Sequence, residues 1–320
     1  MTNRELQSRE IPLSFLCGKD RDRDRDREKV RLYGILHQPA RPSPYGLLIV
    51  TGRPALRTGR HRLFVLLART WAEAGIPVMR FDFRGTGDCE GEMGTLDDTS
   101  EDLASAVDAF MANAPGLHSV VLWGLCGGAA DAILYAPRDP RVIGIAMVNP
   151  WSYDARVRGL TALRRYASFC FGKIYRWTRS AALRGRVAVG AKKDAPTGTE
   201  TRTNQVADPD AAGDPNISAP RATAAVDRAY ASYRVPNLSR RLADSLEKFQ
   251  GRILLILSGR DTGSQAFKHA ASISLRWRRL LSAPRVQTRE LPESNHSLRR
   301  PEWRAQAATW TIEWLHEMRD

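Results

Sequence analysis

A single cysteine stands between glycines at the end of an apolar run, in the stretch VVLWGLCGGAADAILYA over residues 120–136. The run is typical of a buried strand, and the alanine-rich part that follows is typical of a helix. Cys126 therefore lies at a sharp strand-to-helix turn, two positions after Gly124 and two before Gly128. In a nucleophile elbow, small neighbours let such a turn fit while the reactive side chain stays accessible. The pattern predicts a nucleophilic thiol.

The same turn would assist that chemistry electrostatically. A sulfur at a helix N-terminus meets the positive end of the helix dipole, which favours the thiolate. The amide of Gly127 is predicted to point at the oxyanion of an acyl-transfer intermediate. The alternative is that Cys126 is a small buried hydrophobe, the commonest fate of a free cysteine. We assign that structural role to Cys17, Cys89 and Cys170, whereas the flanking glycines favour the reactive role for Cys126.

A nucleophilic thiol needs a base, and the base needs an acid that orients it. His296, in LPESNHSL, follows the last strand-like run, and Asp261, in LLILSGRD, follows the run before it. Parallel strands place their carboxyl ends at one edge of a sheet, where sites are built. The sequence therefore predicts that Cys126, Asp261 and His296 meet as a catalytic triad. His61 is a weaker candidate for a residue that lines the pocket.

Short apolar runs alternate with helical patterns along most of the chain. The runs are rich in Val, Ile and Leu and read YGLLIVTG, GIPVMRFDF, SVVLWG, RVIGIAMVNP, GRILLILSG and RVQTRELP. They are typical of strands buried on both faces. Two further β-like segments, IPLSFLC and KVRLYGILHQP, come first and are joined by the charged spacer GKDRDRDRDREK. The alternation predicts an α/β fold with a mostly parallel, doubly wound sheet and right-handed crossovers.

The alternation breaks once, and this break sets the predicted domain organisation. Residues 1–150 and 251–320 are expected to form the two parts of one core, and residues 151–250 to form a helical cap inserted over the site. The segment near 190–220 has no aromatic residue and almost no large aliphatic one. It cannot bury enough apolar surface to offset its ordering entropy, so we expect it to be flexible.

Composition limits the classes of partner and compartment. The net charge is +14, and residues 152–187 hold nine basic residues against one acid, which is typical of a solvated face and also fits an anionic partner. No nucleic-acid motif accompanies this charge, so no nucleic-acid partner is expected. No apolar run is long enough for a transmembrane segment, and the start lacks a secretory signal, which predicts a cytoplasmic protein. The four cysteines form no C-x-x-C pair, so we expect no metal and no other cofactor.

Four motifs together resemble the α/β-hydrolase superfamily: VMRFDFRGTGDCEGE, GLCGGA, LLILSGRDTGSQAF and LPESNHSL. More narrowly, the chain is similar to the first type of exosortase A system-associated hydrolase, encoded in exopolysaccharide and PEP-CTERM protein-sorting loci of Gram-negative bacteria. The similarity spans nearly the whole chain, except the charged spacer and the segment near 190–220. It implies an α/β-hydrolase fold with a helical cap and the nucleophile, acid, histidine order of Cys126, Asp261 and His296.

The resemblance also implies a second oxyanion amide from the loop TGRPALRTGRHR, for which Arg53 is the candidate. The family often has a small residue there, so the Arg53 side chain must turn away for its amide to face the site. We expect hydrolysis of an ester or thioester, as in a thioesterase, on a small-molecule or carrier-bound acyl substrate. Acyl transfer is an alternative, as is a non-catalytic protein of the same fold that binds an anionic partner. The sequence leaves the acyl group and the oligomeric state open.

Overall fold

The computed structural model describes residues 8–18, 29–94, 99–151 and 237–318. The chain divides into two units, and all described residues belong to the one formed by Met1–Asp154 and Thr223–Asp320. The predicted flexible segment near 190–220 and most of the predicted cap lie outside the described residues, as does Cys170. The cap, predicted over residues 151–250, stays a prediction for residues 152–236.

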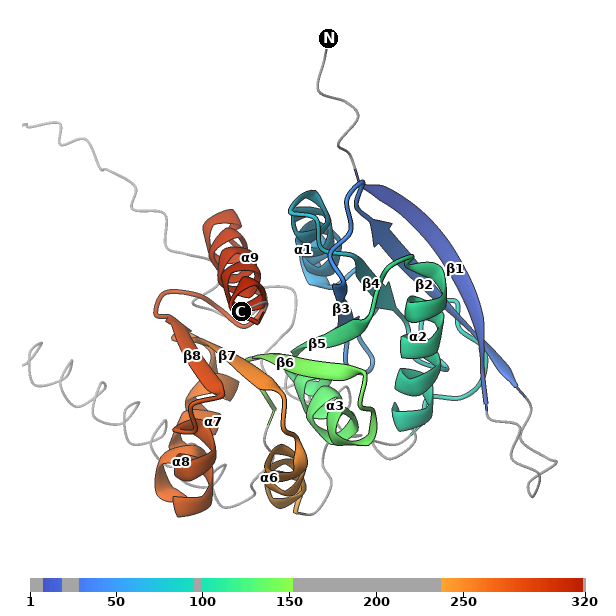
Figure 1. The fold of residues 1–320 in the computed structure, drawn as a ribbon. Coiled ribbons are helices and arrows are strands. Elements are labelled where there is room, and N and C mark those ends of the chain that lie inside the picture. Colours follow the sequence, from blue (N-terminus) through green and yellow to red (C-terminus); the bar gives the residue numbers. More distant parts are fainter. Residues whose placement is uncertain (1–7, 19–28, 95–98, 152–236, 319–320) are drawn as a thin grey trace, which may run out of the picture. The chain divides into compact units, whose positions relative to one another are not determined.

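An eight-stranded sheet forms the centre of this unit, in the order β1-β2-β4-β3-β5-β6-β7-β8 (Figure 1). Strands β1 (Arg9–Cys17) and β2 (Val30–Gln38) form an antiparallel hairpin, and β2 also pairs antiparallel with β4 (Val78–Phe81). From β4 onward every pairing is parallel, through β3 (Tyr45–Val50), β5 (Ser119–Leu125), β6 (Val142–Val148), β7 (Arg252–Ser258) and β8 (Val286–Leu291). The predicted mostly parallel α/β fold is confirmed.

Helices cover both faces of the sheet because its central strands, such as β5, carry apolar side chains on both faces. The side chains of β5 alternate, so that Val120 and Leu122 join one core cluster while Val121 and Trp123 join the other. The first cluster packs against α2 (Thr99–Asn113), α3 (Gly127–Tyr135), α6 (Leu238–Lys248), α7 (Thr262–Ile273) and α8 (Leu275–Leu281). The second packs against α1 (Leu63–Glu73) and α9 (Pro301–His316). The described residues also include two 3₁₀ turns, η1 (Arg60–Arg62) and η2 (Ala136–Arg138).

One domain boundary and the burial of one strand differ from the sequence prediction. Helix α6 falls within the range 151–250 assigned to the cap, yet Leu238, Leu242 and Leu246 are buried in the core cluster. The core therefore resumes by Leu238 and not at residue 251. Strand β8 was expected to be buried on both faces, but it lies at the edge of the sheet and most of its side chains are partly exposed.

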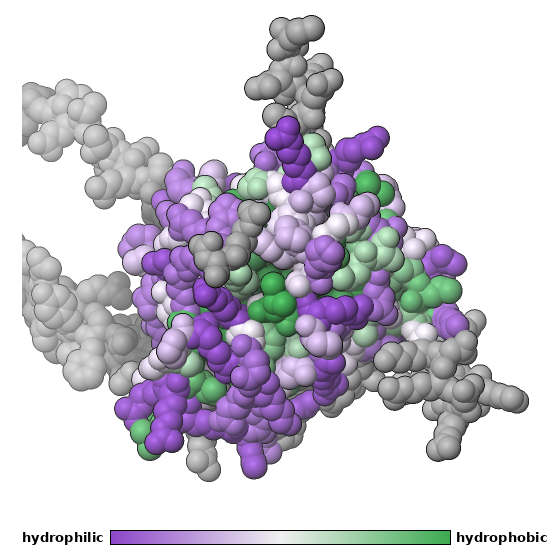
Figure 2. Space-filling model, viewed as in Figure 1, coloured by the Kyte–Doolittle hydropathy of each residue, from purple (hydrophilic) through white to green (hydrophobic). Residues whose placement is uncertain are grey.

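The surface is mostly hydrophilic on the face shown in Figure 2, where apolar side chains gather only in small patches. Large exposed apolar residues of the described unit include Ile11 and Leu16 on β1, Met93 in a loop, Ile273 on α7 and Leu275 on α8. No helix within the described ranges is long and apolar enough to cross a membrane.

Candidate active site

Cys126 occupies the turn between β5 and α3, with φ 56° and ψ −113°. Positive φ is unusual for a residue that is not glycine, and it persists only where the surroundings fix it. Here two backbone hydrogen bonds do so: the Cys126 amide donates to Val148 O at 2.9 Å, and the Trp151 amide donates to Cys126 O at 3.2 Å. The turn is therefore a strained strand-to-helix elbow with the thiol at its apex.

The elbow fits because its neighbours have no side chains. A Cβ on Gly124 would lie 2.5 Å from the backbone of Gly128, and a Cβ on Gly128 would lie 2.0 Å from Val50 O. Gly52, on the loop after β3, would place a Cβ 2.4 Å from Gly128 N. Helix α3 thus presses directly against strand β5 and against the loop that carries Arg53.

Asp261 and His296 lie after β7 and β8, and the structure brings their side chains together. His296 Nδ1 is 3.2 Å from Asp261 Oδ2. Asp261 is also the N-cap of α7, where its carboxylate accepts hydrogen bonds from Gly263 N at 3.2 Å and Ser264 N at 3.0 Å. The carboxylate is therefore fixed by a helix start while it faces the imidazole.

These contacts shift the pKa values of His296 and Asp261. Burial acts to lower the pKa of His296, but the Cys126 sulfur and the Asp261 carboxylate outweigh it and raise that pKa well above its usual range. Burial acts to raise the pKa of Asp261, but the imidazole and the two α7 amides hold that pKa below its usual range. The arrangement favours a protonated imidazole beside the Asp261 carboxylate.

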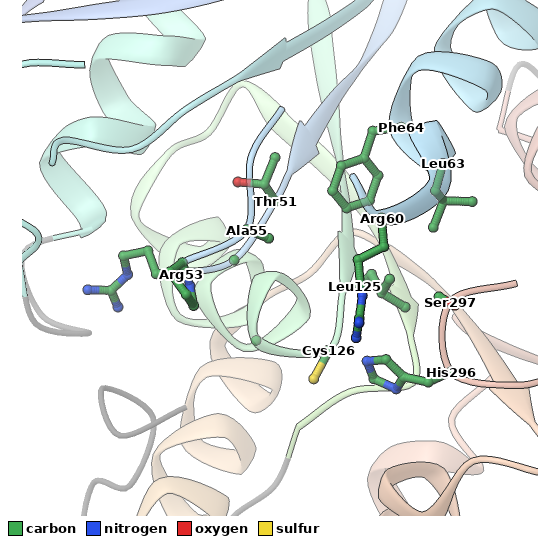
Figure 3. Close-up of a pocket in the computed structure, with 13 residues that line it drawn as sticks. Thr51, Arg53, Ala55, Arg60, Leu63, Phe64, Leu125, Cys126, His296 and Ser297 are labelled. Atoms are coloured by element: carbon green, nitrogen blue, oxygen red, sulfur yellow. The ribbon is translucent and has the colours of Figure 1, made fainter. Parts of the chain in front are cut away.

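One pocket contains both Cys126 and His296 (Figure 3). Its wall also includes Gly127 and Arg53, the two predicted oxyanion donors, together with Arg60. Apolar side chains complete it, namely Leu63, Phe64 and Leu125. His61, the weaker candidate, is exposed and is absent from this wall.

The Arg53 side chain is buried, with 1% of its surface exposed, and points away from Cys126 (Figure 3). It donates a hydrogen bond to Gly94 O, and its Nη2 lies 3.7 Å from the buried Asp131 Oδ1 on α3. A guanidinium can be buried in this way because a carboxylate of opposite charge lies beside it and a carbonyl accepts a hydrogen bond from it. The side chain has thus turned away from the site, as the resemblance required for a donor at this position.

Asn149 is a site residue that sequence reasoning missed. It follows β6 with φ 46°, and its Oδ1 accepts from Ser258 N at 2.8 Å and from Ser264 Oγ at 2.6 Å. Its Nδ2 donates to Ser258 Oγ at 2.9 Å and to His296 O at 3.1 Å. One buried side chain therefore ties the ends of β6 and β7 to the histidine loop. The signal in the sequence was a polar residue before proline at a strand end, in MVNP.

The other described cysteines have different surroundings. Burial raises the pKa of the Cys17 thiol to about 12 and that of the Cys89 thiol to about 11. Cys17 lies beside Asp102 and Arg84, and Cys89 donates to Asp82 O at 3.2 Å. Neither lines the pocket. Across the described ranges, no group of three or more His, Cys, Asp or Glu side chains could hold a metal ion.

Comparison with known proteins agrees with the fold described above. The family model for serine aminopeptidase, S33, matches residues 59–298. Among solved structures, the esterase Pf2001 of Pyrococcus furiosus superposes with a TM-score of 0.60 at 15% identity, over 98% of this chain and 91% of that one. The α/β hydrolase GrgF of Penicillium sp. sh18 gives 0.57 at 16% identity, over 97% and 98%.

A third solved structure is Est1E of Butyrivibrio proteoclasticus, with bound ferulic acid, which gives a TM-score of 0.53 at 14% identity over 90% of this chain and 95% of that one. No curated protein sequence matches the chain. At these identities the solved structures establish the fold, and the family model extends over three quarters of the sequence. The chain is a hydrolase of the α/β-hydrolase fold and belongs to the serine aminopeptidase S33 family.

Proposed function

We propose that the protein hydrolyses an ester or thioester through Cys126, with His296 as general acid and base and Asp261 orienting the imidazole. The observation that supports this proposal is that three groups from three strand ends lie together. Cys126, on its strained elbow, lines one pocket with His296, and His296 Nδ1 is 3.2 Å from the buried Asp261 carboxylate. Nucleophile, base and orienting acid are the parts that covalent acyl transfer needs.

The reaction would proceed in two halves. Cys126 Sγ attacks the carbonyl carbon, a C–S bond forms, and the carbonyl electron pair moves to the oxygen, towards the amides of Gly127 and Arg53. The carbonyl re-forms as the bond to the leaving alcohol or thiol breaks, and His296 donates its proton to that group. In the second half water attacks the acyl-enzyme and gives a proton to His296, the C–S bond breaks, and the carboxylic acid leaves.

A cysteine suits this substrate class. A thiolate attacks esters and thioesters, whose leaving groups depart readily, more effectively than amides. The raised pKa of His296 keeps a proton available for the leaving group at neutral pH. The family is named for serine enzymes, and this chain has Cys126 at the elbow.

The proposal extends to the cellular setting through the motif resemblance described above. The resemblance to exosortase A system-associated hydrolases supports a role in an exopolysaccharide or protein-sorting pathway, with the enzyme acting in the cytoplasm on a small-molecule or carrier-bound acyl group. Acyl transfer is the second candidate, because the same acyl-enzyme can pass its acyl group to an acceptor other than water.

The test is to incubate the protein with p-nitrophenyl esters and acyl thioesters, quench it and digest it for mass spectrometry. We expect an acyl adduct on Cys126 and release of free acid, both lost in Cys126→Ala and both kept in the matched control Cys89→Ala. Added alcohols and amines that divert the product from free acid would establish acyl transfer. An adduct on another residue, or turnover by Cys126→Ala, would overturn the proposal, as would salt-dependent binding of anions without turnover of any substrate.

A further inference from the structure

Arg60 is a charged side chain in the pocket that the proposed reaction does not use. Figure 3 shows its guanidinium reaching into the pocket towards Cys126 and His296. Its side chain makes no hydrogen bond or ion pair with any residue of the described ranges. Arg53 differs, because its guanidinium is buried beside Asp131 and faces away from the pocket.

The backbone around Arg60 is unusual. Gly59 has φ 70°, and a Cβ there would lie 2.8 Å from the Phe64 ring. His61 and Arg62 follow with φ of 50° and 60°, so two successive residues that are not glycine adopt the left-handed region. Such conformations gather where a functional group must be placed in one direction. This turn places Arg60 at the pocket while its neighbours His61 and Arg62 stay outside the pocket wall.

The charges of the wall are one-sided. Among the residues that line the pocket, Arg60 and His296 turn a basic side chain towards it, the Arg53 guanidinium faces away, and there is no Asp or Glu. Leu63, Phe64 and Leu125 line the same pocket as the Arg60 side chain, which is itself exposed to solvent. The thiol already has His296 as a cationic partner. Arg60 is therefore a surplus cation that faces the bound substrate.

We infer that Arg60 recognises a carboxylate on the acyl part of the substrate, so that the enzyme acts on esters or thioesters of short dicarboxylic acids. The planar guanidinium matches a carboxylate in a two-point contact. Cys126 and Arg60 line the same pocket, so one substrate can present its reacting carbonyl to the thiol and its carboxylate to the guanidinium. This inference rests on the proposed function and names its substrate class.

The test compares two N-acetylcysteamine thioesters of the same shape, the anionic succinyl and the neutral 4-methylpentanoyl compound, with uncatalysed hydrolysis subtracted. The variants are Arg60→Gln, Arg60→Lys and the matched control Arg62→Gln, which removes a neighbouring cation of the same turn. We expect wild type to prefer succinyl, and Arg60→Gln to lower the succinyl to 4-methylpentanoyl ratio of kcat/KM about 10- to 100-fold, mainly through KM. Arg60→Lys should recover part of the ratio, and Arg62→Gln should keep it.

A second readout does not need turnover. Cys126 displaces iodide from iodoacetate, which is anionic, and from iodoacetamide, which is neutral, and in each case a C–S bond forms and iodide leaves. The rate ratio of iodoacetate to iodoacetamide should fall in Arg60→Gln and stay constant in Arg62→Gln. Succinate should protect Cys126 from alkylation better than inorganic phosphate does; the reverse order would assign the site to a phosphate group.

The outcomes separate this inference from the proposed function. If Arg60→Gln lowers kcat equally for both thioesters and both alkylation rates equally, the residue supports the thiolate and the inference is wrong, although the proposed function stands. If no thioester is turned over but the alkylation ratio still depends on Arg60, the proposed function fails while the anion site remains. A wild type without preference for succinyl overturns the inference directly.

Discussion

The surroundings of Cys126 and of Cys17 differ within one domain and predict opposite reactivities for the two thiols. Cys17 ends an antiparallel strand at the edge of the sheet, and its sulfur lies 3.2 Å from Asp102 Oδ1, so burial and a nearby carboxylate both oppose the thiolate. Cys126 ends a central parallel strand, and its sulfur shares a pocket with a protonated imidazole. The Arg84 guanidinium also lies 3.1 Å from the Cys17 sulfur, but burial and Asp102 outweigh it, so we predict that Cys17 is the inert thiol and Cys126 the reactive one.

Alkylation should reveal the largest contrast. At pH 7 the pKa of about 12 leaves Cys17 with a thiolate fraction about 1,000-fold below that of a thiol with the reference pKa of 9.0. We expect iodoacetamide to label Cys126 in the folded protein at least about 1,000-fold faster than Cys17, and urea to abolish the difference. Peptide mapping by mass spectrometry over time measures both rates. Equal labelling rates of Cys126 and Cys17 in the folded protein would contradict the predicted difference in reactivity.

Asp261→Asn should weaken the positive charge of His296 beside Cys126. Loss of the carboxylate removes a contact that raises the pKa of His296, so the alkaline limit of the pH profile of kcat/KM, where the imidazole loses its proton, should move to lower pH by about one to two pH units. We expect kcat/KM at neutral pH to fall about 100-fold or more.

The matched control for Asp261→Asn is Asp88→Asn. Asp88 is an exposed carboxylate that pairs with Arg57 and lies outside the pocket wall. Its pH profile should match that of wild type. An unmoved alkaline limit in Asp261→Asn would show that this carboxylate does not set the imidazole charge.

Asn149→Ala should change the position of His296 and leave the charge of its imidazole unchanged. It removes partners from Ser258 N, Ser264 Oγ and His296 O, and buried polar groups left without partners cost about 1–3 kcal/mol. We expect the free energy of unfolding in urea to fall by about that amount and kcat to fall about 10-fold, while the alkaline limit of the pH profile stays in place. A shift of that limit would mean that Asn149 affects the charge of His296.

Cys17→Ala should have the smallest effect on activity. The side chain lies in a small cluster with Leu32 and Cys89, away from the pocket. We expect kcat/KM to stay within about twofold of wild type, with a loss of stability of about 1 kcal/mol from removed packing. Ester turnover and urea unfolding check the two parts separately. A large loss of turnover at unchanged stability would place Cys17 in the mechanism.

Hydrophobic periodicity and the order of residues along the chain were enough to predict the fold and the positions of the candidate site residues. The alternating side chains of β5 and the strand-end positions of Asp261 and His296 follow from local pattern and from the rule that parallel sheets build sites at one edge. The glycines at 124 and 128 marked the elbow because they lie two residues on either side of Cys126. These features are encoded within a few neighbouring residues.

What the sequence did not disclose depends on contacts between distant segments. Asn149 gains its role only when Ser258 and His296 fold beside it, and nothing in MVNP names those partners. Arg60 points into the pocket because of left-handed backbone at the two following residues, which no propensity for His or Arg predicts. The start of the core at Leu238 likewise reflects helix packing and not a change in composition.

The close approach of Gly52, Gly124 and Gly128 has a practical consequence for anyone who wishes to change the specificity of this enzyme. Because the backbones of three segments touch there, a mutant library that varies these positions would consist mostly of misfolded proteins. Such a library should instead vary Ala55 and Leu63, whose side chains line the pocket and do not hold the turn at Cys126 in place.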